Sequence, residues 1–327
     1  MANLFLTNIC DRGCPFCFAK EGPWSQDYPG RPLTTAEVAE FVAIPSLNGR
    51  VERGIVGGEP LQYPQLTEVI RLMWREKLTP KIFTSGSCPL PEDLGSLRFE
   101  GNVHFVVNIS PWDSYPVERQ QCLDQFLKVF GKHVSLAYTM VDPDLDPAFL
   151  LEYIGHYHLQ PFIRIGVALP IVGGTNQYVE RERYRDVGLR MLDFAQKVAQ
   201  QSVSLGTDCG FVACMFTPDE IGRLLQLGAD VTFCCQPVVD IGPELEAWHC
   251  LPLAKLGRVS LRGCENLEQV NAEFRAMAEK LRENFGPGIY DRCAGCKYRE
   301  RGQCVGGCLG LIVPDEECKN GVFALLI

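Results

Sequence analysis

Three cysteines near the start of the chain have the spacing of a metal-cluster site. Cys10, Cys14 and Cys17 form C-x3-C-x2-C shortly after the apolar run at 4–6. Closely spaced thiolates are the usual ligands of an iron–sulfur cluster. Because four ligands are the norm, three thiolates leave one iron without a protein ligand, and an open position is where metal chemistry takes place. The alternatives are inert thiols or a zinc site, and zinc is a poor match because no histidine lies nearby.

A second motif could bind the amino group of a ligand. Gly57-Gly58-Glu59-Pro60 follows the apolar pair at 55–56. Paired glycines let a backbone approach a ligand closely, and the Glu59 carboxylate is an acceptor for an ammonium group. Taken alone, this motif has an ordinary alternative, which is a turn between a strand and a helix.

Taken together, the two motifs resemble the radical S-adenosylmethionine (SAM) superfamily. The resemblance rests on the cysteine spacing, on Phe16 before the last cysteine, and on the order of the two motifs. It implies that Cys10, Cys14 and Cys17 hold a [4Fe–4S] cluster whose open iron binds SAM. The electron from that cluster would cleave SAM to methionine and a 5′-deoxyadenosyl radical.

The resemblance also implies which residues bind SAM. The motif Gly57, Gly58, Glu59 and Pro60 would hold the methionyl amino group. Phe16 would contact the adenine, although core packing is its alternative. Ser110 would contact the ribose or the carboxylate, although a satisfied turn is its alternative. Further polar candidates at expected strand ends are Asn108, Tyr138, Thr139, Arg164 and residues 84–87.

Composition excludes several classes of protein. The chain has 327 residues, of which 46% are hydrophobic and 22% charged, as in an ordinary globular protein. No apolar run is long enough to span a bilayer, and the short segment before Cys10 leaves too little room for a signal peptide. The formal net charge is -9 without any basic run, which argues against nucleic-acid binding. We therefore expect a cytoplasmic protein with neither a membrane nor a nucleic acid as partner.

The first two thirds of the chain alternate strands with amphipathic helices. We expect strands near 3–8, 53–57, 80–84, 103–109, 133–140 and 162–168. We expect helices near 34–44, 63–77, 117–130, 146–157 and 178–200. Such alternation predicts an α/β fold with a parallel sheet. The resemblance implies a partial (β/α)6 TIM-like barrel, with functional loops at the carboxyl ends of the strands.

The composition changes near residue 202, where cysteines become frequent. Eleven of the 16 cysteines lie between Cys209 and Cys318, and only one clear amphipathic helix, near 266–284, is predicted there. Domains with so thin a core are commonly held together by metal. We therefore predict two domains, a barrel over 1–201 and a cysteine-rich domain over 202–327.

The C-terminal cysteines resemble the SPASM extension of radical SAM enzymes, which carries auxiliary [4Fe–4S] clusters. A hairpin is expected between Cys235 and Cys250, followed by C-x2-C-x7-C-x3-C and one more cysteine. The seven-residue spacing and the displaced hairpin glycine depart from the family pattern. The resemblance assigns one cluster to four cysteines, namely Cys293, Cys296, Cys304 and Cys318. It assigns the other to Cys235, Cys250 and Cys308, with a fourth ligand left open among Cys234, Cys214 and Cys209.

Several readings of these cysteines stay open. One auxiliary cluster instead of two, or structural zinc, also fits four-cysteine sites. Cys209 or Cys214 could instead donate a hydrogen atom to a substrate radical, or pack inertly. Cys88, Cys122 and Cys264 stand alone and are expected to be inert thiols. Asp208 and Asp240 are acid–base candidates by position only.

The resemblance implies an oxidoreductase that modifies a peptide or protein side chain, forming a crosslink, a thioether or a related product. An electron donor such as flavodoxin or ferredoxin is implied as a partner. The main alternative is the same chemistry on a small-molecule substrate. Maturation of sulfatases is a weaker alternative, because those maturases have an acidic residue where Leu251 follows Cys250 here. A non-catalytic electron carrier would make no use of the Gly57–Pro60 motif.

Overall fold

The computed structural model describes residues 2–19, 31–45, 51–235 and 238–316. Its strands are β1 (Ala2–Phe5), β2 (Glu52–Val56), β3 (Thr79–Thr84), β4 (His104–Asn108), β5 (Val134–Met140), β6 (Phe162–Val167), β7 (Ser204–Thr207), β8 (Val239–Ile241), β9 (Glu246–Trp248) and β10 (Val259–Ser260). Its helices are α1 (Thr35–Val42), α2 (Leu66–Arg75), α3 (Leu97–Glu100), α4 (Val117–Phe130), α5 (Phe149–Tyr157), α6 (Tyr184–Gln200), α7 (Pro218–Gln226), α8 (Leu267–Phe285) and α9 (Lys297–Glu300).

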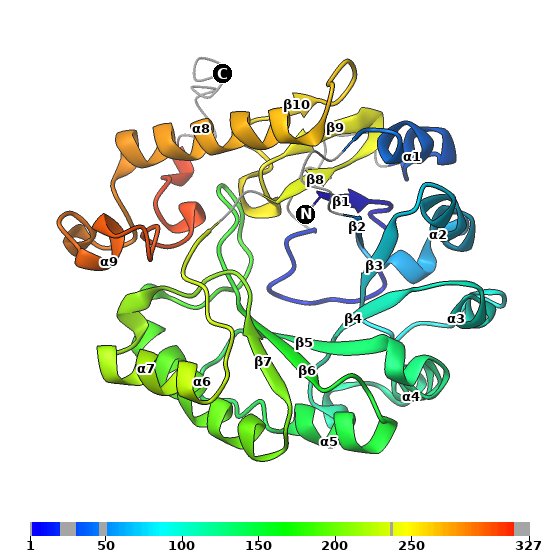
Figure 1. Cartoon of the computed structure of the whole chain (residues 1–327), viewed down its shortest axis with the longest axis horizontal. Coiled ribbons are helices and arrows are strands. Elements are labelled where there is room, and N and C mark those ends of the chain that lie inside the picture. Colours follow the sequence, from blue (N-terminus) through cyan, green and yellow to red (C-terminus); the bar gives the residue numbers. More distant parts are fainter. Residues whose placement is uncertain (1, 20–30, 46–50, 236–237, 317–327) are drawn as a thin grey trace.

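These strands form one curved sheet in the order β10-β9-β8-β1-β2-β3-β4-β5-β6-β7. Strands β1 to β7 pair in parallel, and β8 pairs in parallel with β1. Figure 1 shows the sheet curving around the centre of the molecule, with helices α1 to α6 on its outside. The mixed α/β fold and the partial barrel predicted from the sequence are confirmed.

The core lies between the outer face of the sheet and these helices. Phe105 of β4 packs against Phe126 and Phe130 of α4, with ring centroids 5.1 and 4.4 Å apart. The alternating burial of β5 and β6 follows from this arrangement, because successive side chains point to opposite faces of a strand. Side chains on the inner face, such as Phe83, Thr139 and Arg164, are half-buried. The inner face of the barrel therefore offers a partly accessible, mostly polar wall.

The sheet continues past residue 202, where the domain boundary was predicted. Strand β7 pairs with β6, while the predicted hairpin is present as β8 and β9, antiparallel to one another. Helix α7 was not predicted, although Thr217 and Glu220 form a capping box with Pro218 at its first turn. Among the described residues, no helix is both long and apolar enough to cross a membrane.

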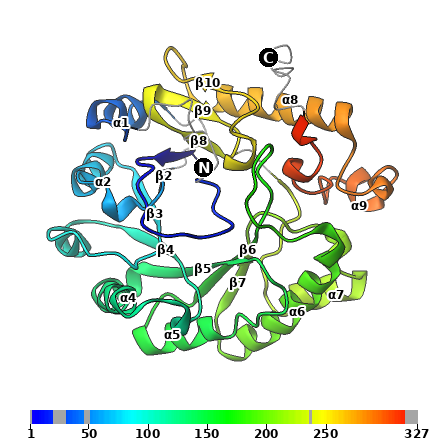
Figure 2. The same ribbon diagram turned by 180° about the vertical axis from the view of Figure 1, so that it is seen from behind.

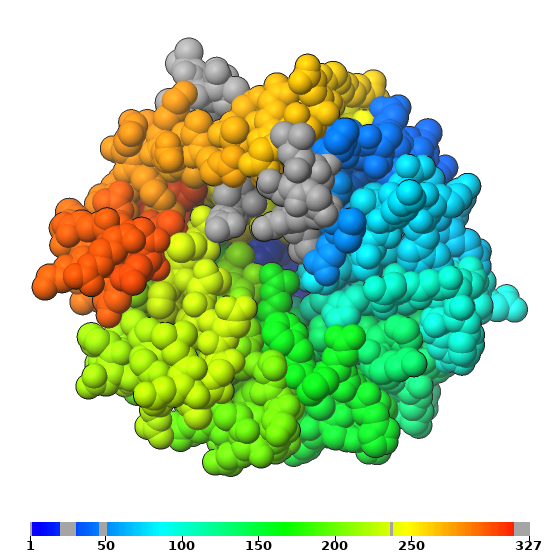
Figure 3. Space-filling model, in the orientation of Figure 1, coloured from blue at the N-terminus to red at the C-terminus, as the bar shows by residue number. Residues whose placement is uncertain are grey.

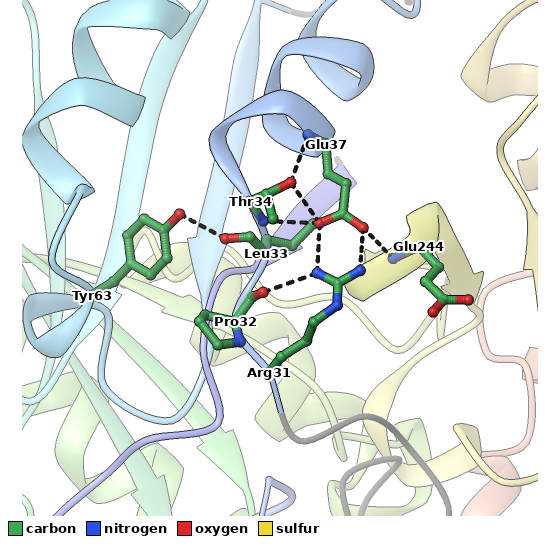
Figure 4. A network of polar contacts seen from close by, with 7 residues as sticks. All are labelled: Arg31, Pro32, Leu33, Thr34, Glu37, Tyr63 and Glu244. Atoms are coloured by element: carbon green, nitrogen blue, oxygen red, sulfur yellow. Dashed lines mark hydrogen bonds and ion pairs between the residues drawn. The ribbon is translucent and has the colours of Figure 1, made fainter.

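Glu37 joins helix α1 to the C-terminal hairpin (Figure 4). Its carboxylate accepts both Nη groups of Arg31, at 2.8 and 2.7 Å, and closes a capping box with Thr34. It also accepts the backbone N–H of Glu244 at 2.7 Å. Because Glu244 precedes β9, this single buried carboxylate connects the first helix of the barrel to the C-terminal region.

This network predicts a pH-dependent stability. The hydrogen bond from Arg31 lowers the pKa of Glu37 from 4.5 to about 2. A lowered folded-state pKa stabilises the fold above the unfolded pKa, and this stabilisation is lost as the pH falls from about 4.5 toward 2. The shift corresponds to roughly 3 kcal/mol at most. We expect Glu37→Gln to lower the free energy of unfolding at pH 7 and to have a smaller effect at pH 3, where about two fifths of this stabilisation remains.

Urea unfolding of the iron-free proteins, followed by tryptophan fluorescence, measures this difference. The matched control is Glu40→Gln, because Glu40 is an exposed residue of the same helix. Equal destabilisation by Glu37→Gln at both pH values would contradict the assigned pKa.

Candidate active site and cysteine groups

The three N-terminal cysteines lie in a loop that directly follows β1. In both Figure 1 and Figure 2 this loop runs across the middle of the ring of strands. All three thiols are half-buried. The N–H of Cys17 donates to the carbonyl of Cys14 at 3.2 Å, and the N–H of Arg12 donates to the Cys10 sulfur at 3.4 Å. The loop therefore keeps the three thiols in one compact, partly accessible turn.

Residues from several barrel elements hold the cysteine loop in place. Arg119 of α4 donates to the carbonyl of Asp11 at 2.6 Å and pairs with its carboxylate at 3.1 Å. The Arg12 guanidinium lies 5.4 Å from the centre of the Tyr115 ring. The N–H of Gln177, beyond β6, donates to the carbonyl of Pro15 at 2.9 Å. The loop is thus fixed over the carboxyl ends of the strands, where barrel sites are expected.

The Gly57–Pro60 motif packs directly against the segment that leads into this loop. The N–H of Gly58 donates to the carbonyl of Thr7 at 2.6 Å, and the N–H of Glu59 donates to that of Ile9 at 2.8 Å. A Cβ at Gly58 would lie only 2.3 Å from the Ile9 oxygen. Glycine is therefore required here, because the two backbones touch. The structure brings the two sequence motifs together.

The Glu59 side chain is buried and its carboxylate accepts four hydrogen bonds. The donors are the N–H of Leu61 at 3.1 Å, Thr84 Oγ1 at 2.5 Å, Ser85 N–H at 2.9 Å and Ser85 Oγ at 2.6 Å. A carboxylate has about four acceptor sites, so this one is fully used. Glu59 therefore fixes the loop after β3 relative to β2, a role that its charge alone did not predict.

Electrostatics around Cys10 oppose a free thiolate. Burial raises the pKa of the Cys10 thiol, the N–H of Arg12 lowers it, and the nearby Glu59 carboxylate adds to the rise. Ligation to a metal removes the proton outright, so a bound cluster would relieve this cost. Three thiols on one short, accessible loop fit the three-ligand site that the sequence predicted.

Polar side chains from successive strands line the inner wall below this loop. Asn108 of β4 donates to Thr139 of β5 at 3.0 Å. Arg164 of β6 pairs with Asp208, just beyond β7, at 2.5 Å, and lies 5.6 Å from the Phe83 ring centre. The N–H of Ser110 donates to the Tyr115 hydroxyl at 2.8 Å. Phe16 is half-buried.

The C-terminal cysteines separate into two groups. Cys293, Cys296 and Cys304 line one small cavity together with Cys214. In the other group, the thiols of Cys209 and Cys250 each interact electrostatically with both Cys235 and Cys308. Burial raises the pKa of all four thiols in this second group, for Cys308 to about 12. Cys209 and Cys214, which the sequence offers as candidates for a fourth ligand, lie beside different groups of three cysteines.

The remaining cysteines are not members of these two groups of four thiols. Cys88 is buried, whereas Cys122, Cys234 and Cys264 are half-buried. Cys318 lies outside the described residues. Within the described part of the chain, no three His, Cys, Asp or Glu side chains converge closely enough to hold a single metal ion. Ligands of a four-iron cluster need not converge in this way, because the cluster itself occupies the space between them.

Asp240 and His249 are buried at the junction between β1 and the hairpin. Asn3 Nδ2 donates to Asp240 at 2.8 Å, and burial raises the pKa of Asp240 to about 7. Burial lowers the pKa of His249 to about 4. His249 lines a cavity together with Cys235 and Cys304, and neither Asp240 nor His249 makes a described hydrogen bond to the 10–17 loop, so we assign neither of them a catalytic role.

Comparison with known proteins agrees with this geometry. Residues 4–135 match the sequence profile of the Radical SAM superfamily. This match spans the cysteine loop, the Gly57–Pro60 motif and the first four strands, so this part of the chain is similar to that superfamily. No curated protein matches the sequence.

Solved structures with a similar fold cover nearly the whole chain. One is Streptococcus suis SuiB bound to S-adenosylmethionine, at 12% identity and a TM-score of 0.65, covering 97% of this chain and 76% of that one. SuiB bound to the precursor peptide SuiA matches at 13% identity and a TM-score of 0.64, over 94% and 71%. The protein anSMEcpe with bound AdoMet and Cp18Cys peptide matches at 14% identity and a TM-score of 0.63, over 100% and 97%. At these identities the likeness establishes the fold.

Proposed function

We propose that this protein is a radical SAM enzyme that oxidises a side chain of a peptide or protein, with auxiliary iron–sulfur clusters in its C-terminal region. The observation that carries the proposal is the pairing of one accessible three-thiol loop with two further groups of four thiols. Proteins of similar fold have been solved with bound peptides, which favours a peptide over a small molecule as substrate.

The N-terminal residues would hold the SAM-cleaving centre. Cys10, Cys14 and Cys17 would ligate a [4Fe–4S] cluster, which supplies the electron that cleaves SAM. Backbone groups of the Gly57–Pro60 motif, positioned by Glu59, would hold the methionyl amino group. Phe16 and Ser110 stay the candidates for the adenine and for the ribose or carboxylate.

The C-terminal residues would serve electron transfer. Oxidation of a substrate takes one hydrogen atom to deoxyadenosine and a further electron to an acceptor, and an auxiliary cluster is a suitable acceptor. Cys235, Cys250 and Cys308 would hold one such cluster with Cys209 as the fourth ligand, because these four thiols interact. We keep the division between 1–201 and 202–327 as one of function, since the sheet itself runs through it. A flavodoxin or ferredoxin would supply the electrons.

The proposed substrate class can be tested by co-expression. The enzyme is produced anaerobically with short peptides encoded beside its gene, and the peptides are analysed by mass spectrometry. We expect one peptide to lose the mass of two hydrogen atoms, which is the change that an internal crosslink or an internal thioether requires. Unmodified peptides alongside a modified small metabolite would favour the small-molecule alternative.

A change at Glu59 should weaken SAM binding through the hydrogen-bond network. In Glu59→Gln, the side-chain NH2 group replaces one acceptor oxygen and faces donors from Thr84 or Ser85. Breaking a buried charged network costs about 1.5–3 kcal/mol, so we expect a SAM affinity lower by about tenfold or more. The cluster of the cysteine loop should be retained.

Two comparison variants distinguish a positioning role of Glu59 from direct contact between its carboxylate and SAM. Thr84→Val removes one donor to Glu59 and should also weaken SAM binding, whereas Glu68→Gln changes an exposed carboxylate on α2 and should not. Titration calorimetry of the anaerobic protein measures all three affinities. If Thr84→Val left the affinity unchanged, the positioning role of Glu59 would be wrong.

A further inference from the structure

The cavity that Cys214 shares with the C-terminal cysteines lies at the junction of two distant segments. Its wall comprises Val212, Ala213 and Cys214 on one side, and Ile289, Cys293, Cys296, Arg299, Cys304 and Gly306 on the other. Figure 3 shows the surface over the segment after β7 in contact with the orange and red C-terminal segment. The fold, and not sequence spacing, thus brings Cys214 to the other three cysteines. Cys293 and Cys304 are buried, Cys296 is half-buried and Cys214 is exposed.

Cys214 is held firmly on the barrel side of this junction. It lies in a 3-10 turn, Ala213–Met215, whose carbonyl at Met215 accepts from Arg185 of α6 at 2.9 Å. Gly188 of α6 packs so closely that a Cβ there would lie 2.2 Å from the same oxygen. Cys214 therefore lies in a turn that contacts with α6 hold in place.

The other three cysteines are held by turns of the C-terminal segment. The N–H of Cys296 donates to the carbonyl of Cys293 at 3.4 Å, and the N–H of Gly306 donates to the Cys304 sulfur at 3.4 Å. A Cβ at Gly307 would lie 3.2 Å from a Val212 methyl group, so the two segments touch. Glycine is favoured at residue 307 because its φ of +89° lies in the left-handed region and because a Cβ there would lie 2.8 Å from an Ile289 methyl group.

Two arginines lie near these thiols. The Arg292 guanidinium beside Cys214 lowers the pKa of that thiol, which burial raises by more, and Arg299 lines the cavity itself. Anionic thiolates and an anionic cluster are stabilised by such neighbours. Four thiols with two guanidinium groups match the donor set of a four-cysteine cluster.

We propose that Cys214 is the fourth ligand of the auxiliary cluster held by Cys293, Cys296 and Cys304, in place of Cys318. The cluster would then link the turn after β7, which α6 holds in place, to the C-terminal segment at 289–306. This assignment rests on the proposed function, which supplies the auxiliary clusters, and it goes beyond it in naming a ligand from the barrel side.

Iron counting in a chain without the N-terminal site tests the assignment. In the background Cys10→Ala, Cys14→Ala, Cys17→Ala, only auxiliary clusters remain, and about eight irons are expected after anaerobic reconstitution. Into this background we introduce Cys214→Ala, Cys293→Ala, both together, and Cys318→Ala. Iron, sulfide and Mössbauer spectra are measured, and circular dichroism monitors folding.

The proposal predicts about four irons for Cys214→Ala, for Cys293→Ala and for their combination, because all remove the same cluster. It predicts about eight for Cys318→Ala. Loss of nearly all iron in the combined variant would place Cys214 in the other cluster, and loss of about four irons in Cys318→Ala alone would restore Cys318 as the ligand. A background protein with no iron would instead refute the auxiliary clusters of the proposed function.

A measurement on the unmodified enzyme covers the case in which a variant does not fold. The holoprotein is treated with iodoacetamide, with and without prior removal of iron by a chelator, and labelled cysteines are identified by mass spectrometry. Cys214 should be protected together with Cys293 until iron is removed, while Cys318 should be labelled in both samples. Labelling of Cys214 in the holoprotein would overturn the assignment.

Discussion

Replacement of Cys10, Cys14 and Cys17 together by alanine is expected to abolish SAM cleavage and to remove about four irons. The three thiols share one loop over the carboxyl ends of the strands, held by Arg119 and Gln177. Because these contacts come from backbone and charged groups, the fold should survive the loss of the sulfur atoms. Rates of 5′-deoxyadenosine formation should fall below detection.

The matched control is Cys122→Ala. Cys122 is a half-buried thiol on α4, the helix that carries Arg119, and lies in neither C-terminal group of thiols. Iron content and deoxyadenosine formation should be unchanged in this control. Undiminished iron in the triple variant would mean that the N-terminal loop is no cluster site.

The second large effect is expected from Cys304→Ala. This thiol lines the cavity with Cys214, Cys293 and Cys296, so its removal leaves a four-thiolate site one ligand short. None of the hydrogen bonds described for the 10–17 loop involves residues 293–308, so radical generation should persist. We expect the loss of about four irons and of the modified product, with 5′-deoxyadenosine still formed without coupling to product.

Deoxyadenosine and product are quantified side by side for Cys304→Ala and for Cys264→Ala. Cys264 is a suitable control because it is a C-terminal cysteine that contacts the carbonyl of Ser260 and belongs to neither group of thiols. Full product formation with normal coupling in Cys304→Ala would show that the C-terminal cysteines are structural and that the auxiliary site is wrongly assigned.

The sequence was sufficient for the barrel strands because their signal is local. Apolar strands alternate with amphipathic helices through β6, and helix α4 begins and ends where its pattern predicts. Strand β7 has only four residues, two of them glycine or serine, and it was not predicted. The capping box at Thr217 and Glu220 is a usable signal for α7, but the amphipathic segment that follows it is short, with nine residues.

The site was only partly predictable, for a physical reason. Ligation depends on which thiols meet in space, and Cys214 meets Cys293 only because α6 and the C-terminal turns bring two distant segments together. The hydrogen bonds of Glu59 also depend on the fold. The sequence shows the charge of this residue, but three of its four hydrogen bonds come from Thr84 and Ser85, at the end of another strand. The spacing of the cysteines in the sequence indicates which residues can be ligands, whereas the fold determines which of these residues lie together.

The central claim is tested most directly by wild-type protein purified without oxygen, reduced with dithionite and mixed with SAM. Metal analysis and chromatography of the products are the readouts. We predict about twelve irons from three [4Fe–4S] clusters, no stoichiometric zinc, and accumulation of 5′-deoxyadenosine and methionine. Protein that contains stoichiometric zinc in place of iron, and that leaves SAM intact after reduction, would contradict the assignment as a radical SAM enzyme.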